Sequence, residues 1–132
     1  MNDPTTEASS ELIVVAPEVR DALAGGVGVV ALETTLVAHG FPHPDGAAVG
    51  AASEAAVRAA GAIPATIGVI DGRIRVGLSP AEVGRFGHAG SAARKVGPRD
   101  LAACAVQGAL GATTVGGTLA VCRTVGITVM AT

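Results

Sequence analysis

Aromatic side chains are scarce in this sequence, which has two Phe and neither Trp nor Tyr among its 132 residues. Proteins that bind single-stranded nucleic acid rely on aromatic side chains, on which the bases stack. Positive charge is not in excess either, because nine Lys and Arg face eleven Asp and Glu, giving a net charge of −2. A basic surface is what attracts a nucleic-acid backbone. We therefore expect no nucleic-acid partner.

Cysteine is also rare, and the two that are present, Cys104 and Cys122, do not form a CxxC motif. Isolated thiols of this kind are typical of small buried side chains in a reducing cytoplasm, and a disulfide is the alternative. The start of the sequence has no charged segment followed by an apolar one, so it shows no secretory signal. Both observations predict a cytoplasmic protein.

The longest uncharged segment is interrupted in a way that argues against a membrane span. Leu101 to Cys122 carries no charge over 22 residues, which is long enough to cross a bilayer. However, Gln107, Thr113–Thr114 and Gly116–Gly117 divide it, and its hydrophobicity rests largely on Ala and Gly. We predict two short helices with a strand between them, and no membrane partner.

Small and aliphatic residues are abundant, since 49% of the residues are hydrophobic and 19 are glycine. The core must therefore be closed mainly by Ala, Val, Leu and Ile, with close approaches between helices and a sheet. The length allows at most one domain. Strand-like and helix-like segments alternate, which is typical of a mostly parallel sheet between two helical layers. We predict a three-layer α/β/α fold, with residues 1–10 as a disordered polar tail and residues 11–132 as part of one domain.

Capping and turn signals place the individual elements. An Asp-Gly pair between two β-rich runs is the strongest hairpin signal, and it predicts a β-hairpin around Asp71–Gly72. The sequence ends on an apolar strand, so we expect the fold to be incomplete at its C-terminal end. The predicted helices are 17–24, 46–60 capped by Asp45, 80–86 with a Ser79/Glu82 capping box, 101–110 ended by Gly111, and a last helix to Val125; the predicted strands are 27–32, 65–70, 73–76, a short one near 111–114 and 128–131, with loops at 39–44 and 87–93.

Glu33 is the first polar residue after the apolar strand 27–32 and is followed by Thr34 and Thr35. Open α/β sheets bind their ligands beyond the carboxyl ends of buried strands. A carboxyl at that place, held in one rotamer by the two hydroxyls, suits a general acid. The structural alternative is that Glu33 only caps a turn or pairs with an arginine.

Lys95 is the only lysine, because the other eight basic residues are arginine. A compact ammonium can contact a phosphate at one point or react with a carbonyl, which a planar guanidinium does less well. This pattern makes Lys95 a candidate substrate-binding residue. The alternative is that one lysine falls there by chance.

The remaining polar motifs give weaker signals. The segment Gly111 to Thr118 reads as a strand, a Gly-rich turn and a helix start, where backbone N–H groups can bind an anion, although most such segments are only tight turns. His39 and His43 have HxxxH spacing, but Gly40 and Pro42 interrupt the helix that a metal site would need. We expect His39 to order the loop or face a ligand, and His43 to lie on the surface.

Five blocks of the sequence together resemble the pseudouridine-5′-phosphate glycosidase family. The resemblance covers residues 17–132 and corresponds to the N-terminal part, less than half, of a family member. It implies an α/β/α fold, homotrimers, a divalent metal, typically manganese (Mn2+), and the reversible cleavage of pseudouridine 5′-phosphate into uracil and ribose 5-phosphate. The blocks are ALETTLVAHGFP, RAAGAIPATIGVIDGRIRVGLS, RKVGPRDL, GATTVGGT and GITVMAT.

The resemblance also assigns roles to three residues. It implies that Glu33 is the proton donor, that Lys95 contacts the substrate, and that Val115 contacts it through its backbone. A uracil carbon is a poor leaving group, and the family captures the opened ribose as an imine on a lysine. That lysine and the metal-binding aspartate would follow Thr132, so we expect no metal ligand within this chain and no activity from it alone.

Two other functions are compatible with the residues. The Gly-rich segment would also suit a non-catalytic α/β module that binds a phosphate or a nucleotide. The apolar final strand would suit a structural remnant that pairs with another chain through an open sheet edge.

Overall fold

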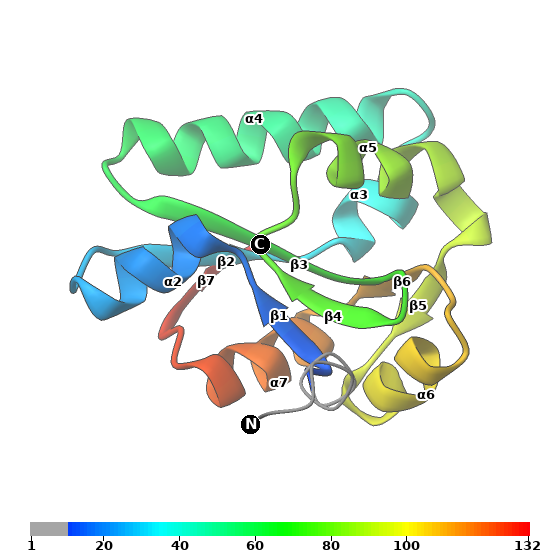
Figure 1. Ribbon diagram of the computed structural model, residues 1–132. Coiled ribbons are helices and arrows are strands. Elements are labelled where there is room, and N and C mark those ends of the chain that lie inside the picture. Colours follow the sequence, from blue (N-terminus) through cyan, green and yellow to red (C-terminus); the bar gives the residue numbers. More distant parts are fainter. Residues whose placement is uncertain (1–10) are drawn as a thin grey trace.

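One mixed sheet runs through the middle of the molecule, and helices cover both of its faces (Figure 1). The computed structural model describes residues 11–132, so the predicted disordered tail lies outside the described residues. The strands are β1 (Ile13–Val15), β2 (Val29–Leu32), β3 (Ile63–Ile70), β4 (Arg73–Val76), β5 (Arg94–Val96), β6 (Gly111–Thr113) and β7 (Val129–Ala131). The helices are α2 (Pro17–Ala24), α3 (Thr35–His39), α4 (Asp45–Ala59), α5 (Pro80–Ala89), α6 (Leu101–Val106) and α7 (Val115–Val125), with 3₁₀ turns at Gly90–Ala92 and Pro98–Asp100.

The sheet has the order β1-β4-β3-β2-β7, and β6 joins it on β3 and carries β5. The pairings β1/β4, β2/β3, β2/β7 and β5/β6 are parallel, whereas β3/β4 and β3/β6 are antiparallel. The predicted mostly parallel sheet is therefore confirmed. The antiparallel contact between β3 and β6 was not predicted, and neither was β1, which is only three residues long.

Two hydrophobic cores lie on opposite faces of the sheet, which confirms the three layers. Ile67 and Val69 of β3 face the core that α2, α6 and α7 cover, and Ile70 faces the core beneath α3 and α5. Phe86 is fully buried in the second core. A methyl group at Gly68 would lie 2.6 Å from the Phe86 ring, so glycine allows the close approach that the composition predicted.

The hairpin between β3 and β4 forms at the predicted turn. Asp71 and Gly72 have φ angles of 51° and 77°, and two positive φ angles are what the tightest hairpin turns require. Arg85 donates to the Asp71 carboxylate at 3.0 Å and lowers its pKa. This contact ties the turn to α5, which begins with the predicted capping box of Ser79 and Glu82.

Several helix boundaries differ from the prediction for local reasons. Pro44 is the N-cap residue of α4, and Asp45 is its first residue without capping it. The expected loop 87–93 instead continues α5 to Ala89, because Gly87 packs tightly against Ala47 of α4.

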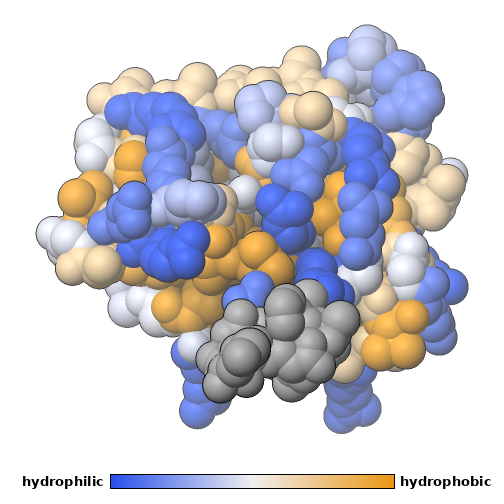
Figure 2. All heavy atoms as spheres, viewed as in Figure 1, coloured by the Kyte–Doolittle hydropathy of each residue, from blue (hydrophilic) through white to orange (hydrophobic). Residues whose placement is uncertain are grey.

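On the surface, the exposed alanines of α4 give the top edge in Figure 2 a weakly hydrophobic colour.

The segment after β5 also differs in detail. Helix α6 ends at Val106 rather than residue 110, since Gly108 takes the left-handed conformation with a φ of 63°. Gly111 therefore begins β6 and does not end the helix. The division of 101–122 into two helices and a strand is confirmed, and no helix in residues 11–132 is long and apolar enough to span a bilayer. Cys104 and Cys122 are buried free thiols, as predicted.

Candidate active site

The carboxyl ends of two strands meet on one edge of β3. Strand β2 runs parallel to β3 and ends beside Thr66, whereas β6 runs antiparallel to it and pairs with Gly68 and Val69. The two strands therefore point at each other across Ile67. We call this place the strand junction. It lies beyond the carboxyl ends of two strands, which is where open α/β sheets bind their ligands.

Two more strands end at the same place. In β5, Lys95 is paired in register with Ala112 of β6, and in β7, Ala131 is paired with Leu32 of β2. Since both pairings are parallel, the carboxyl ends of β5 and β7 lie next to those of β6 and β2. The residues that follow the four strands are thus gathered at the strand junction.

Glu33 follows β2 at this junction and is 9% exposed. Its Oε1 accepts a hydrogen bond from the hydroxyl of Thr132, which follows β7. The prediction that Thr34 and Thr35 hold the carboxylate was wrong, because their hydroxyls bond to backbone carbonyls instead. Among the described residues Glu33 forms no ion pair and caps no helix, so its structural alternatives have no support from residues 11–132.

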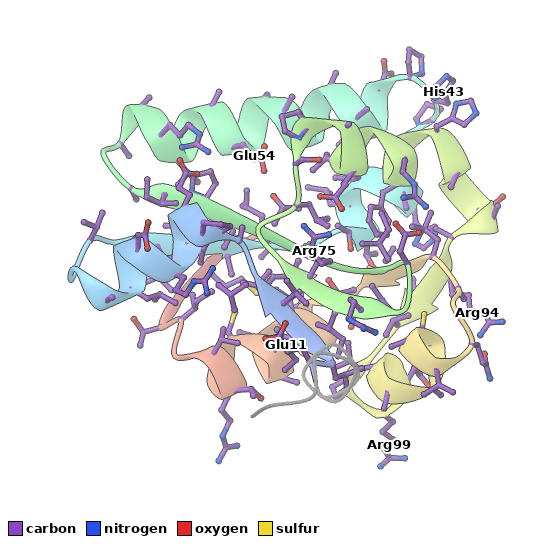
Figure 3. All side chains as sticks on the ribbon, in the orientation of Figure 1. Glu11, His43, Glu54, Arg75, Arg94 and Arg99 are labelled. Atoms are coloured by element: carbon purple, nitrogen blue, oxygen red, sulfur yellow. The ribbon has the colours of Figure 1, made fainter. Side chains whose placement is uncertain are left out.

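Lys95 is exposed and belongs to the same sheet face as Ala93, which packs in the core beneath α3 and α5. Its neighbour Arg94 projects to the other side, where it contacts Gln107, and Figure 3 shows Arg94 and Arg99 extending away from the sheet. Within the described part of the chain, Lys95 takes part in no salt bridge. Its ammonium therefore has no carboxylate partner there that a ligand would have to displace.

Val115 is the first residue of α7 and is 41% exposed. Thr114 is the N-cap residue, and its hydroxyl accepts from the Gly117 N–H at 3.1 Å. The Thr114 N–H donates to the carbonyl of Val96 at 3.0 Å, so the helix start lies directly beside the strand that carries Lys95. The first N–H groups of a helix have no partner inside it, and here they belong to Val115 and Gly116.

The Gly-rich segment is therefore not a separate turn. Gly116 and Gly117 lie in the first turn of α7, directly after the capping threonine. A methyl group at Gly117 would lie 2.5 Å from the carbonyl oxygen of Val96, whereas the nearest contact at Gly116 would be an ordinary one of 3.5 Å, to Pro98. The glycine at 117 thus allows the helix start to approach β5.

The two histidines of the HxxxH pattern have separate contacts. His39 ends α3, and its Nε2 bonds to the carbonyl of Ala93 at 2.9 Å, which supports the predicted loop-ordering role. His43 is exposed outside the helix, as predicted (Figure 3). Its ring packs edge-to-face on that of His88, and the ring centroids are 5.3 Å apart. No group of three or more His, Cys, Asp or Glu in residues 11–132 could hold a metal ion.

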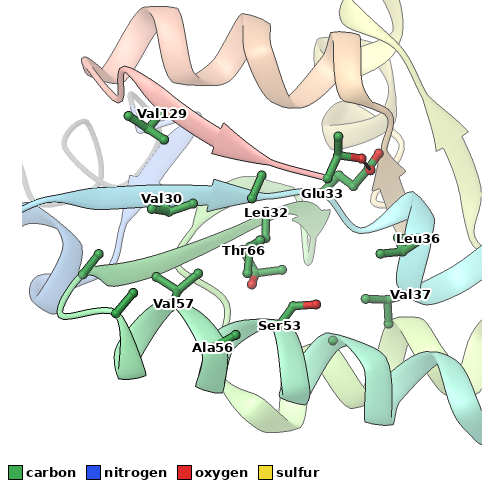
Figure 4. A pocket seen from close by; sticks show the side chains of 15 residues that line it. Val30, Leu32, Glu33, Leu36, Val37, Ser53, Ala56, Val57, Thr66 and Val129 are labelled. Atoms are coloured by element: carbon green, nitrogen blue, oxygen red, sulfur yellow. Dashed lines mark hydrogen bonds between the residues drawn. The ribbon is translucent and has the colours of Figure 1, made fainter.

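An apolar cavity opens next to Glu33, between α4 and the sheet (Figure 4). It has a volume of about 470 Å³ and extends from Leu36 to Val129. The Val129 residue is 54% exposed, so the cavity is open at that end. Ser53 and Thr66 provide hydroxyl groups on its lining. Sequence reasoning did not find this cavity, nor the contact of Thr132, because both depend on how α4 and β7 pack on β2.

Comparison with known proteins places the chain in a family. The family profile described as "Indigoidine synthase A like protein" matches residues 18–132. The chain belongs to the indigoidine synthase A-like family. Curated relatives named pseudouridine-5′-phosphate glycosidase include those of Chloroflexus aurantiacus (48% identical, 92% of this chain and 40% of the relative), Streptomyces griseus (47%, 99% and 40%) and Escherichia coli K12 (44%, 94% and 40%). The resemblance inferred from the sequence is confirmed.

Two solved structures share the fold of this chain. One is the prealnumycin C-glycosynthase AlnA in complex with ribulose 5-phosphate, with a TM-score of 0.79, 37% identity, and coverage of 93% of this chain and 39% of AlnA. Another is an indigoidine synthase A-like protein from Thermotoga maritima, with a TM-score of 0.78, 31% identity, and coverage of 92% and 39%. The chain thus spans about 40% of the length of the curated relatives it matches.

Proposed function

We propose that this chain is the N-terminal part of an enzyme that reversibly cleaves the C–C glycosidic bond of pseudouridine 5′-phosphate to uracil and ribose 5-phosphate. The observation that carries this proposal is the gathering of Glu33, Lys95 and Val115 where four strands end. The names of the curated relatives give the reaction class.

In this proposal Glu33 is the proton donor. Glu33 is 9% exposed and lines an apolar cavity at the strand junction. A leaving carbon must gain a proton, and a positioned carboxylic acid supplies it better than solvent does. Within the described residues Glu33 forms no ion pair, so no basic side chain there would have to be displaced by a substrate.

Lys95 and the start of α7 bind the phosphorylated sugar in this proposal. Lys95 is exposed, and the hydrogen bond from the Thr114 N–H to the Val96 carbonyl places its strand beside the start of α7, where Val115 is the first residue. A cation next to a helix N-terminus favours an anionic group. The sugar phosphate named in the AlnA structure, ribulose 5-phosphate, is a ligand of the same class.

The whole enzyme needs groups that residues 11–132 do not supply. As the family resemblance implies, we assign the manganese ligand and the imine-forming lysine to a segment after Thr132. We also propose that the complete protein is a cytoplasmic homotrimer, as the family resemblance implies.

Titration of the chain with ribose 5-phosphate and with uracil tests the binding part of this proposal. We expect ribose 5-phosphate to bind with NMR shifts at Lys95 and Val115, and Lys95→Met to weaken binding strongly. The matched control is Arg123→Met, which removes an exposed charge from α7. If inorganic phosphate binds as tightly as ribose 5-phosphate, the result would favour a non-catalytic anion-binding module. If ribose 5-phosphate does not bind, the result would contradict both the enzyme and the anion-binding module.

A further inference from the structure

We propose that three buried threonines, Thr34, Thr113 and Thr118, form a positioning device that fixes Glu33 relative to the start of α7. We call them the threonine cluster. None of the three has measurable exposure to solvent. The inference rests on the proposed function of Glu33 and Val115, and it adds residues that the family resemblance did not assign.

The cluster fills the gap at the strand junction. The carbonyl of Ile67 lies between the ends of β2 and β6. It accepts from the Thr34 hydroxyl at 2.9 Å and from the Thr113 hydroxyl at 2.8 Å. The Thr113 N–H in turn donates to the Thr34 hydroxyl at 2.8 Å. Each strand end is therefore bonded both to β3 and to the other strand end.

The direction of the hydrogen bond between the Thr113 and Thr118 hydroxyls follows from the number of hydrogens that each hydroxyl can donate. A hydroxyl has one hydrogen to donate, and Thr113 uses its hydrogen for the Ile67 carbonyl. In the contact of 2.8 Å between the Thr113 and Thr118 hydroxyls, Thr118 must therefore be the donor. This bond connects the strand junction to the first turns of α7.

Each member of the cluster is next to a residue of the proposed site. Thr34 directly follows Glu33, Thr113 is two residues before Val115, and Thr118 lies one turn into α7 and donates its N–H to the Thr114 carbonyl at 2.8 Å. Water cannot replace a lost hydroxyl easily in such a buried place. A change at Thr118 should therefore move Glu33, although the two residues belong to segments far apart in the sequence.

Binding of ribose 5-phosphate tests the proposal through Thr113. Valine has the shape of threonine but no hydroxyl, so Thr113→Val leaves Ile67 with one donor and Thr118 with no acceptor. We expect roughly tenfold weaker binding for Thr113→Val and near-normal binding for Thr113→Ser, which keeps the hydroxyl. The matched control is Thr124→Val, because the exposed Thr124 bonds only to Ala120 within α7. A folded Thr113→Val that binds normally would refute the proposal.

NMR of the unliganded chain tests it without any ligand. Thr118→Val removes a single donor, and we expect it to move the carboxyl carbon signal of Glu33, whereas Thr124→Val and Thr118→Ser should leave that signal in place. An unchanged Glu33 signal in folded Thr118→Val would overturn the proposal. This test does not depend on whether Thr113→Val folds. If the unsubstituted chain does not bind ribose 5-phosphate, the proposed function fails and this NMR result alone decides the positioning role.

Discussion

The substitution Gly117→Ala should separate the start of α7 from β5. A methyl group there would lie 2.5 Å from the Val96 carbonyl oxygen, and ordinary contact begins near 3.4 Å, so the two elements must separate by about 0.9 Å. Overpacking of this kind costs about 1–3 kcal/mol. Alanine regains up to about 1 kcal/mol of helix propensity. With the full gain of about 1 kcal/mol, we expect a net loss of up to about 2 kcal/mol of unfolding free energy, which lowers the Tm by up to roughly 10 °C.

The matched variant is Gly116→Ala, whose methyl group would meet only Pro98 at 3.5 Å. We expect its Tm to be unchanged or slightly higher. Thermal unfolding followed by circular dichroism measures both variants. Because a displacement of about 1 Å can remove much of a site's activity, Gly117→Ala should also weaken ribose 5-phosphate binding more than Gly116→Ala does. Equal Tm values and equal affinities for the two variants would show that the close approach to Val96 has no importance.

Three further predictions concern single residues. In a full-length version, Glu33→Gln should lower the rate of uracil release about 10²–10⁴-fold while binding survives, because an amide cannot donate the proton; near-normal turnover would make Glu33 structural. Lys95→Arg should raise the KM strongly despite the retained charge, since the larger guanidinium spreads it; a normal KM would mean that the lone lysine is a coincidence. Burial raises the pKa of the Cys104 and Cys122 thiols, so both should react slowly with a thiol reagent at pH 8 in the native chain and fast in denaturant; fast reaction of the native chain would contradict their burial.

The elements with strong local signals were predictable from the sequence. The Asp71–Gly72 turn, the Ser79 capping box and the end of the last helix at Val125 all depend on a few neighbouring residues, and each was confirmed. Glu33 was placed at a strand end by the apolar run before it, which is also a local pattern.

The features that were missed depend on contacts between distant segments. The antiparallel pairing of β6 with β3 has no sequence signal, because a three-residue strand can pair in either direction. The hydroxyls of Thr34 and Thr35 were assigned to Glu33 because they are its neighbours, but they bond to Ile67 and Ala112. Only the tertiary arrangement decides which of several nearby acceptors a hydroxyl finds.

The strand junction has a consequence for the order of folding. Thr34 and Thr113 are 79 positions apart, whereas the β3–β4 hairpin closes through a two-residue turn. Contacts between distant residues require a larger loss of chain entropy before they form, and they therefore form late. The hairpin can supply the edge of β3 early, but the junction closes only when β6 has reached that edge. The proposed site is thus among the last parts of this chain to assemble, and its geometry reports that folding is complete.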